Sequence, residues 1–237
     1  MDTTSQILQS ADYLLLLIIL IVLAGKVIRR HEIRTFWMLV ALAWTMNLFG
    51  NIAWVIHDLT TGTPLNTFSA VDLFYGARYV LIGIAIWLYP MPLSRRDGIW
   101  AGAVTVIANI MIWAIYFNPA MKIRGGDWTG FLGLAMYPAL DTALIMLAWF
   151  RFRAVQEGWQ AKFFLLLFCA MASYGVANTL NLTGYVFPSM NSGILPNIFW
   201  ILTNIFLLLL TFGFSETKEK GWWSTQAVSA QNAIEKR

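Results

Sequence analysis

Long apolar runs separated by short polar breaks fill the chain from residue 11 to residue 214. Each run holds about twenty residues, which is the length that an α-helix needs to cross the hydrocarbon core of a bilayer. The pattern predicts seven spanning helices, near 11–28, 35–57, 68–90, 99–117, 130–150, 161–184 and 194–214. We therefore expect an all-α integral membrane protein, with a seven-helix domain at 1–214 and a short cytoplasmic tail at 215–237.

The most informative stretch joins the second and third runs across a Gly/Pro break. Asn51 and Trp54 are three residues apart and share one helical face, as do Asp72 and Tyr75 after the break. A similar arrangement recurs around a later break, at Asn178, Asn181, Asn197 and Trp200. We infer a parallel repeat in which the second and third helices correspond to the sixth and seventh.

Composition supports a membrane protein and narrows the chemistry. The chain has 237 residues, of which 59% are apolar and 12% are charged, and its mean hydropathy is +0.64. A chain with this composition is too hydrophobic to be a water-soluble domain. The single cysteine, Cys169, lies inside an apolar run, so neither a disulfide framework nor a cysteine metal site can form. We expect no metal and no cofactor.

Basic residues lie almost entirely on one side of the predicted bundle. All of the 16 lysines and arginines follow the first, third, fifth or seventh run, except Arg78, Lys122 and Arg124. Because positive loops stay in the cytoplasm, the N-terminus is expected outside and the C-terminus inside, in the inner or plasma membrane. This topology accounts for the basic residues, so no nucleic-acid partner is expected. Trp100 and Trp113 lie near run ends, where indole rings prefer the membrane interface.

Polar side chains at membrane depth are costly, by roughly 2.5–3.5 kcal/mol each for Asp, Lys and Arg. Counted along their helices, four of them fall in one layer, namely Asn47, Arg78, Asp141 and Asn204. A shallower belt contains Asn51, Asp72, Asn178, Asn181 and Asn197. We expect Arg78 and Asp141 to pair directly, since they are the opposite charges placed deep in the spans. The first run, mainly Leu and Ile, is expected to face lipid.

Two interpretations of this belt remain open, and they are compatible. The polar groups can act as interhelical contacts, because amides hydrogen-bond across membrane bundles. Alternatively they line an outward-facing cavity for a small ligand, with aromatic walls from Trp54, Tyr75, Tyr79, Tyr137 and Trp200. For Asp72 a third role is a carboxylate at a helix start, near the positive end of the helix dipole.

Several chemistries are excluded. The last run has no lysine for a retinal Schiff base, and His31 and His57 are about one membrane thickness apart, too far to hold a haem together. No phosphate-binding loop or Ser/His/Asp order is present.

The hairpin resembles a known family. FGNIAWVIHDL and SAVDLFYGARYVLIGIAIW, with YPALDTALIMLAW later, are similar to the seven-helix membrane input region that precedes many bacterial diguanylate cyclases and histidine kinases. That family has a Gly-Asp-x-x-Trp helix followed by an Asp-x-x-Tyr helix and a Tyr-Pro-x-x-Asp helix. Asn51 stands where the family often has Asp, and no signalling domain follows the seventh helix. The resemblance implies a free-standing sensory module.

A second, weaker resemblance is to the small seven-helix terpene cyclases of meroterpenoid pathways. Their Asn-x-x-Trp-Glu motif matches Asn51 and Trp54, but Val55 replaces the Glu, and Asn204 lies near the family's acid in the last helix. Because epoxide protonation needs a carboxylic acid, this interpretation would require Asp72 or Asp141 as the catalytic acid.

We therefore expect a membrane module that recognises a small or lipid-like ligand and acts through a separate membrane or cytoplasmic signalling partner, rather than an enzyme. The alternatives are an intramembrane terpene cyclase acting on a prenylated substrate and an accessory subunit of a larger membrane complex. The candidate ligand-binding residues are Asn47, Asn51, Trp54, Asp72, Tyr75, Arg78, Asp141, Asn178, Asn197, Trp200 and Asn204.

Overall fold

A computed structural model describes most of the predicted membrane domain. The described residues are 3–28, 33–61, 69–89, 95–123, 128–155, 159–187, 189 and 193–213. The predicted tail at 215–237 and three ends of two predicted spans, at 68, 90 and 214, lie outside them.

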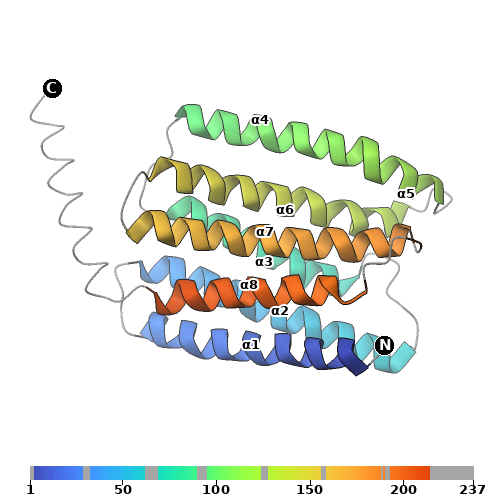
Figure 1. Ribbon diagram of the computed structural model, residues 1–237, viewed down its shortest axis with the longest axis horizontal. Coiled ribbons are helices and arrows are strands. Elements are labelled where there is room, and N and C mark those ends of the chain that lie inside the picture. Colours follow the sequence, from blue (N-terminus) through green and yellow to red (C-terminus); the bar gives the residue numbers. More distant parts are fainter. Residues whose placement is uncertain are drawn as a thin grey trace, which may run out of the picture.

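Helices account for nearly all of the described residues, which contain no β-strand, and this confirms the predicted all-α class. The elements are α1 (Thr3–Ile28), α2 (Arg34–Thr61), α3 (Ala70–Leu88), α4 (Arg95–Ile112), the π-helical segment η1 (Trp113–Phe117), α5 (Asn118–Ile123), α6 (Trp128–Ala154), α7 (Trp159–Val186) and α8 (Leu195–Phe212). The segments α4, η1 and α5 follow one another without a break and form one long rod (Figure 1).

Six of these helices are long and apolar enough to cross a membrane. They coincide with six of the seven predicted runs and are α1, α2, α3, α4, α7 and α8. The remaining run, 130–150, forms α6, which carries Asp141, Arg151 and Arg153 among its apolar residues. Several helices extend beyond their apolar runs: α1 begins at Thr3, and α2 continues to Thr61.

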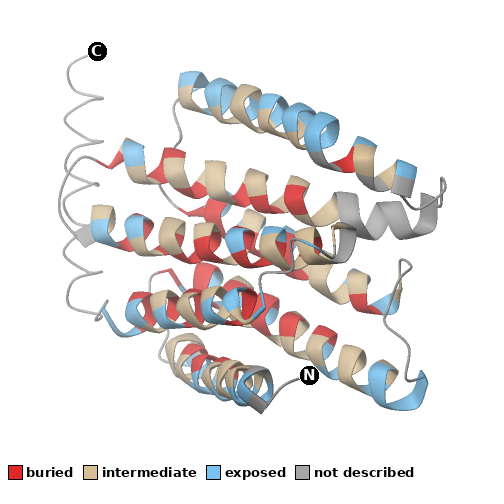
Figure 2. Cartoon of the chain, turned by 45° about the vertical axis from the view of Figure 1, so that its right-hand side comes forward, coloured by how far each residue is buried: buried red, intermediate tan, exposed pale blue. Residues whose placement is uncertain are grey.

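The helices pack as a ring with one helix outside it. Going round the ring, each contacts the next in the order α1, α2, α3, α6, α7 and α8, and α8 returns to α1. The rod of α4, η1 and α5 lies beside α6, outside this ring (Figure 1). None of the α4 side chains is buried, in contrast to the interior faces of the ring helices (Figure 2).

The expectation that the first helix faces lipid describes only part of α1. Leu16, Ile19 and Leu23 are fully buried against the neighbouring helices, while Leu14 and Ile21 on other faces are exposed. The buried positions are spaced by three and four residues, so they form one stripe along α1 that faces the bundle. Its mainly Leu/Ile composition hides this stripe, because both faces are equally apolar.

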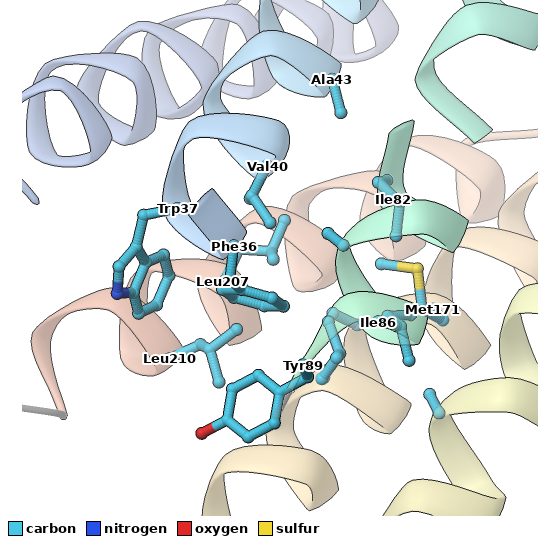
Figure 3. Packing of buried hydrophobic residues seen from close by; sticks show 14 of the residues in the cluster. Phe36, Trp37, Val40, Ala43, Ile82, Ile86, Tyr89, Met171, Leu207 and Leu210 are labelled. Carbon is cyan, nitrogen blue, oxygen red and sulfur yellow. The ribbon is translucent and has the colours of Figure 1, made fainter. Parts of the chain in front are cut away.

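Apolar side chains fill the half of the bundle interior where α2 begins and α3 ends. Phe36, Trp37, Tyr89, Phe163 and Phe164 form an aromatic cluster there, with ring centroids 4.9–6.0 Å apart. Ile82, Ile86, Met171, Leu207 and Leu210 pack with the cluster in the same core (Figure 3). We call this half the apolar half, and the buried polar groups described below lie beyond it.

Basic side chains gather at the end of the bundle next to the apolar half, which we call the charged end. The antiparallel helices bring their basic ends together there (Figure 1): Lys26, Arg34, Arg95, Arg96, Arg151, Arg153 and Lys162. At the opposite end the described residues include one basic side chain, Lys122. The segregation read from the sequence is therefore present in three dimensions.

Close contact between α2 and α3 depends on Gly50. A Cβ atom at this position would lie 2.6–3.0 Å from three ring atoms of Tyr75. Any other residue would have to push this ring, and hence α3, away from α2.

We expect Gly50→Ala to lower the stability of the folded protein by about 1–3 kcal/mol, because the new methyl group overlaps the Tyr75 ring. Thermal unfolding in detergent, followed by circular dichroism, measures the change. Gly102→Ala on α4 is the matched control, since a Cβ there meets nothing within 4 Å. The control should be neutral or slightly stabilising. Equal losses in both variants would show that the α2–α3 approach is not tight.

Candidate functional site

Asp72 lies at the start of α3 and is held from two helices. Ser69 caps α3: its hydroxyl accepts the Val71 N–H at 3.2 Å, and its own N–H donates to Asp72 Oδ2 at 2.8 Å. This reciprocal arrangement is a capping box. The other carboxyl oxygen, Oδ1, accepts the Tyr137 hydroxyl of α6 at 2.7 Å. Asp72 therefore fixes the start of α3, as one interpretation of the sequence expected, and also ties α3 to α6.

One turn further along α3, Tyr75 joins α3 to α2. Its hydroxyl donates to Asn51 Oδ1 at 2.6 Å, and its ring occupies the space left by Gly50. The Tyr137 ring lies 6.2 Å from the Tyr75 ring in an edge-to-face arrangement. The two predicted motif residues Asn51 and Tyr75 are therefore direct partners.

Arg78 is buried in the middle of the bundle, with 2% of its surface exposed. Its guanidinium donates to Asn47 Oδ1 at 3.3 Å and lies 3.6 Å from the ring centroid of Tyr174. The rings of Tyr79 and Trp44 are further cation–π neighbours, at 4.5 and 5.8 Å. Its buried Nε has no hydrogen-bond partner in the described part of the chain. The cation is thus surrounded by aromatic faces, with hydrogen-bonding capacity left over.

Asp141 is buried on α6 and is held by neutral donors. The Tyr79 hydroxyl donates to Oδ1 at 2.6 Å and the Asn178 amide donates to Oδ2 at 2.9 Å. The same amide donates to the Tyr79 oxygen at 2.8 Å. On α7, Gly175 makes this approach possible, because a Cβ there would lie 3.3 Å from the Asp141 Cβ.

A tryptophan and an asparagine of α8 extend these contacts. Trp200 donates its indole N–H to Asn178 Oδ1 at 3.3 Å. One turn later, Asn204 accepts the indole N–H of Trp44 at 3.2 Å and donates its amide to Asp12 Oδ1 of α1 at 2.7 Å. Polar contacts therefore reach every helix of the ring.

The predicted direct ion pair between Arg78 and Asp141 was wrong. Both side chains are buried at the expected depth, but the hydrogen bonds to Asp141 come from Tyr79 and Asn178. Tyr79 follows Arg78 on the same helix, and its ring lies beside the guanidinium while its hydroxyl reaches the carboxylate. Tyr79 thus lies between the two charges, where the sequence predicted a direct contact.

These side chains form what we call the polar network. Tyrosine ring contacts connect its parts: the rings of Tyr79 and Tyr137 are tilted and those of Tyr79 and Tyr174 are edge-to-face, each pair with centroids 6.2 Å apart. Its members are Asp12, Trp44, Asn47, Asn51, Asp72, Tyr75, Arg78, Tyr79, Tyr137, Asp141, Tyr174, Asn178, Trp200 and Asn204. Of the candidates from the sequence, Trp54 is half-buried and outside these hydrogen bonds, and Asn197 is buried in the first turn of α8.

Three members were missed from the sequence: Asp12, Trp44 and Tyr174. Each lies on a seam of residues spaced by three and four positions. On α1 the buried residues Leu16, Ile19 and Leu23 continue the face that Asp12 begins. Trp44 falls one turn before Asn47, and Tyr174 one turn before Asn178. Extending the faces of Asn47 and Asn178 by one turn would have found Trp44 and Tyr174, and extending the face of Leu16 by one turn would have found Asp12.

Hydrogen bonds hold the two carboxyl groups that the sequence offered as catalytic acids. Both oxygens of Asp72 and both oxygens of Asp141 accept hydrogen bonds. Each carboxyl group is therefore fixed in place by two neighbouring residues, and lone pairs remain on its oxygens. In the described ranges no group of three or more His, Cys, Asp or Glu side chains could hold a metal ion.

We expect the stability losses of Arg78→Met and Asp141→Leu to be coupled by about 0.5–3 kcal/mol, because Tyr79 mediates between the charges. The double variant should then remain clearly less stable than the wild-type protein. A thermal-unfolding double-mutant cycle in detergent measures the coupling. Arg78→Met combined with Asp72→Asn is the control cycle and should be close to additive. Full recovery of stability in the Arg78/Asp141 double variant would point to a direct pair instead.

Comparison with known proteins gives no relative. No family model, no curated protein and no solved structure matches this chain.

Proposed function

We propose that the chain is a seven-span membrane sensory module that binds a small or lipid-like ligand at the polar network. Six helices suited to spanning are joined in this proposal by α6, which gives seven spans with the N-terminus outside. The charged end then faces the cytoplasm of a plasma or inner membrane, and the polar network lies in the outer half. The motif resemblance to bacterial sensory input regions supports this function, and the signal would pass to a separate protein.

The main support for this proposal is the incomplete hydrogen bonding of Arg78. A guanidinium has five N–H donors, and in the described residues its one hydrogen-bond partner is Asn47, at the long distance of 3.3 Å. A group that served only to join helices would be expected to have its buried donors satisfied. The unpaired Nε, enclosed by Tyr174, Tyr79 and Trp44, is suited to a ligand that supplies an acceptor oxygen.

The bundle interior is divided into the apolar half and the polar network, and this division favours binding of a ligand over its transport through the bundle. The aromatic cluster of Phe36, Trp37, Tyr89, Phe163 and Phe164 fills the apolar half with close ring contacts. A polar ligand that reached Arg78 would find the packed apolar half between itself and the charged end. Such an interior suits a site approached from one side.

The hydrogen bonds support the proposed repeat. In the first hairpin, Tyr75 of α3 donates to Asn51 of α2, and in the second, Trp200 of α8 donates to Asn178 of α7. Each pair joins an aromatic residue near a helix start to an asparagine of the preceding helix. Two such hairpins would place matching recognition groups on both sides of the ligand.

Ligand binding is favoured over the cyclase interpretation because Val55 and Asn204 stand where the resembled cyclases carry their acids. Asp72 and Asp141, the remaining candidates for a catalytic acid, each hold two neighbouring residues by hydrogen bonds. The aromatic rings around them are compatible with both functions, so they do not discriminate. An accessory subunit remains the second alternative, and isolation of the protein with stoichiometric membrane partners would favour it.

We expect a ligand to remain bound during mild purification of the wild-type protein and to be depleted in Arg78→Gln. Organic extraction followed by mass spectrometry compares the two preparations. Added back to protein freed of it, the extracted compound should bind Arg78→Gln roughly ten- to a hundredfold more weakly than wild type, since a buried hydrogen bond to a charged group is lost.

Two further variants keep this experiment decisive. Trp200→Phe retains the ring and removes the N–H, so it should weaken binding while the protein still folds. Arg34→Gln removes an exposed guanidinium outside the network and should retain the ligand. Equal retention in all four proteins would contradict a site at Arg78, and recovery of a cyclised prenyl compound would favour the enzyme.

The orientation is tested by cysteine labelling of intact cells in a Cys169→Ser background. A cysteine at Thr63 should react with a membrane-impermeant maleimide, and one at Ser94 should react only after the cells are opened. Both positions lie outside the described residues, in breaks between predicted spans. External labelling at Ser94 with protection at Thr63 would reverse the proposed topology.

A further inference from the structure

A groove of about 720 Å³ lies between the outlying helix α4 and the ring, at the charged end. This size falls within the range of about 300–1,000 Å³ that is usual for small-molecule sites. Its walls come from α4, α6 and α7, and it is separate from the polar network, with which it shares no residue. The lining residues are Arg96, Asp97, Trp100, Val104, Ile145, Met146, Trp149, Phe150, Arg153 and Phe168.

The groove changes in character along its length. Because α4 begins where α6 ends, residues four apart on the two helices come in matched levels. Arg96 and Arg153 form the first level, at the end of the bundle, and Trp100 and Trp149 form the second. The third level is aliphatic, with Val104 facing Ile145. From the first to the third level the helix rise gives about 12 Å.

The apolar walls are formed by packed side chains. The Trp149 ring contacts the Phe168 ring of α7, with centroids 5.2 Å apart, and Phe150 is buried beside it. Trp100 is exposed on the α4 side. The groove is therefore charged at its mouth, amphipathic at its middle level and apolar at its inner end.

We propose that this groove binds an anionic phospholipid of the leaflet next to the charged end. The three levels follow the order of a phospholipid: the phosphate contacts Arg96 and Arg153, the glycerol ester region contacts Trp100 and Trp149, and one acyl chain passes Val104 and Ile145. Guanidinium groups suit phosphate oxygens, and indole rings prefer this depth of the bilayer.

Charge complementarity favours an anionic lipid over a neutral one. The two arginines at the mouth exceed the single carboxylate that lines the groove, Asp97. Arg95 and Lys162 add further positive charge at the same end of the bundle. Basic residues near a membrane surface attract anionic lipids, and the apolar inner end gives the acyl chain a place that a soluble phosphate cannot use.

The lipid also fits the way in which α4 is packed. This helix contacts the ring through α6, and none of its own side chains is buried. An acyl chain in the groove would add apolar contact between α4 and both α6 and α7. Lipid binding should therefore hold the outlying helix on the ring.

Native mass spectrometry of the full chain in detergent, titrated with phosphatidylglycerol or phosphatidylcholine of identical acyl chains, tests the proposal. Phosphatidylglycerol should bind more tightly. In Arg96→Gln/Arg153→Gln its affinity should fall roughly fivefold for each arginine removed, to the level of phosphatidylcholine. The matched control, Arg95→Gln/Lys162→Gln, removes the same charge from the same end without touching the groove and should retain most of the affinity.

The apolar inner end is tested separately. Val104→Trp fills the groove without changing charge and should abolish the preference for phosphatidylglycerol, whereas Val106→Trp on an exposed face of α4 should preserve it. Glycerol 3-phosphate, which lacks acyl chains, should not compete. Equal binding of the two lipids, equal loss in both charge variants, or competition by glycerol 3-phosphate would each overturn the proposal.

Discussion

The structure depends on the need to surround the buried cation of Arg78. Arg78 lies in the centre of an apolar helix bundle, where a guanidinium without neighbours would be very costly. Aromatic faces surround the guanidinium: the rings of Tyr174, Tyr79 and Trp44, from three different helices, enclose it. Each of these side chains then needs a partner for its own polar atom, and the hydrogen bonds that follow spread outward to all six ring helices.

Placing a tyrosine between the two charges has a physical consequence. A direct pair would bring Arg78 and Asp141 into contact, and each would be largely saturated by the other. Tyr79 instead gives the carboxylate a short hydrogen bond and gives the cation a π face, so the Nε of Arg78 stays unpaired. The attraction between the charges is kept in part, while hydrogen-bonding capacity remains at the centre of the bundle. This combination is more useful to a recognition site than to a purely structural contact.

The sequence predicted where the helices lie along the chain better than it predicted which helices contact one another. Runs of twenty apolar residues and the depth of each polar group can be counted along the chain, and the four residues that this count puts in one layer, Asn47, Arg78, Asp141 and Asn204, are all buried. Which of them touch depends on the order of helices round the ring. That order passes from α3 directly to α6 and leaves α4 outside, and nothing in the apolar pattern encodes this step. Tyr79 therefore meets Asp141, 62 residues away, in a contact that counting cannot find.

The hydrogen bond between Asp12 and Asn204 joins the first helix of the ring to the last, across 192 residues of sequence. During synthesis α1 enters the membrane long before α8 exists, so Asp12 has no amide partner while the intervening helices are made. The ring can close only when the final helix arrives, and full burial of polar side chains is thereby delayed until the whole chain has left the ribosome.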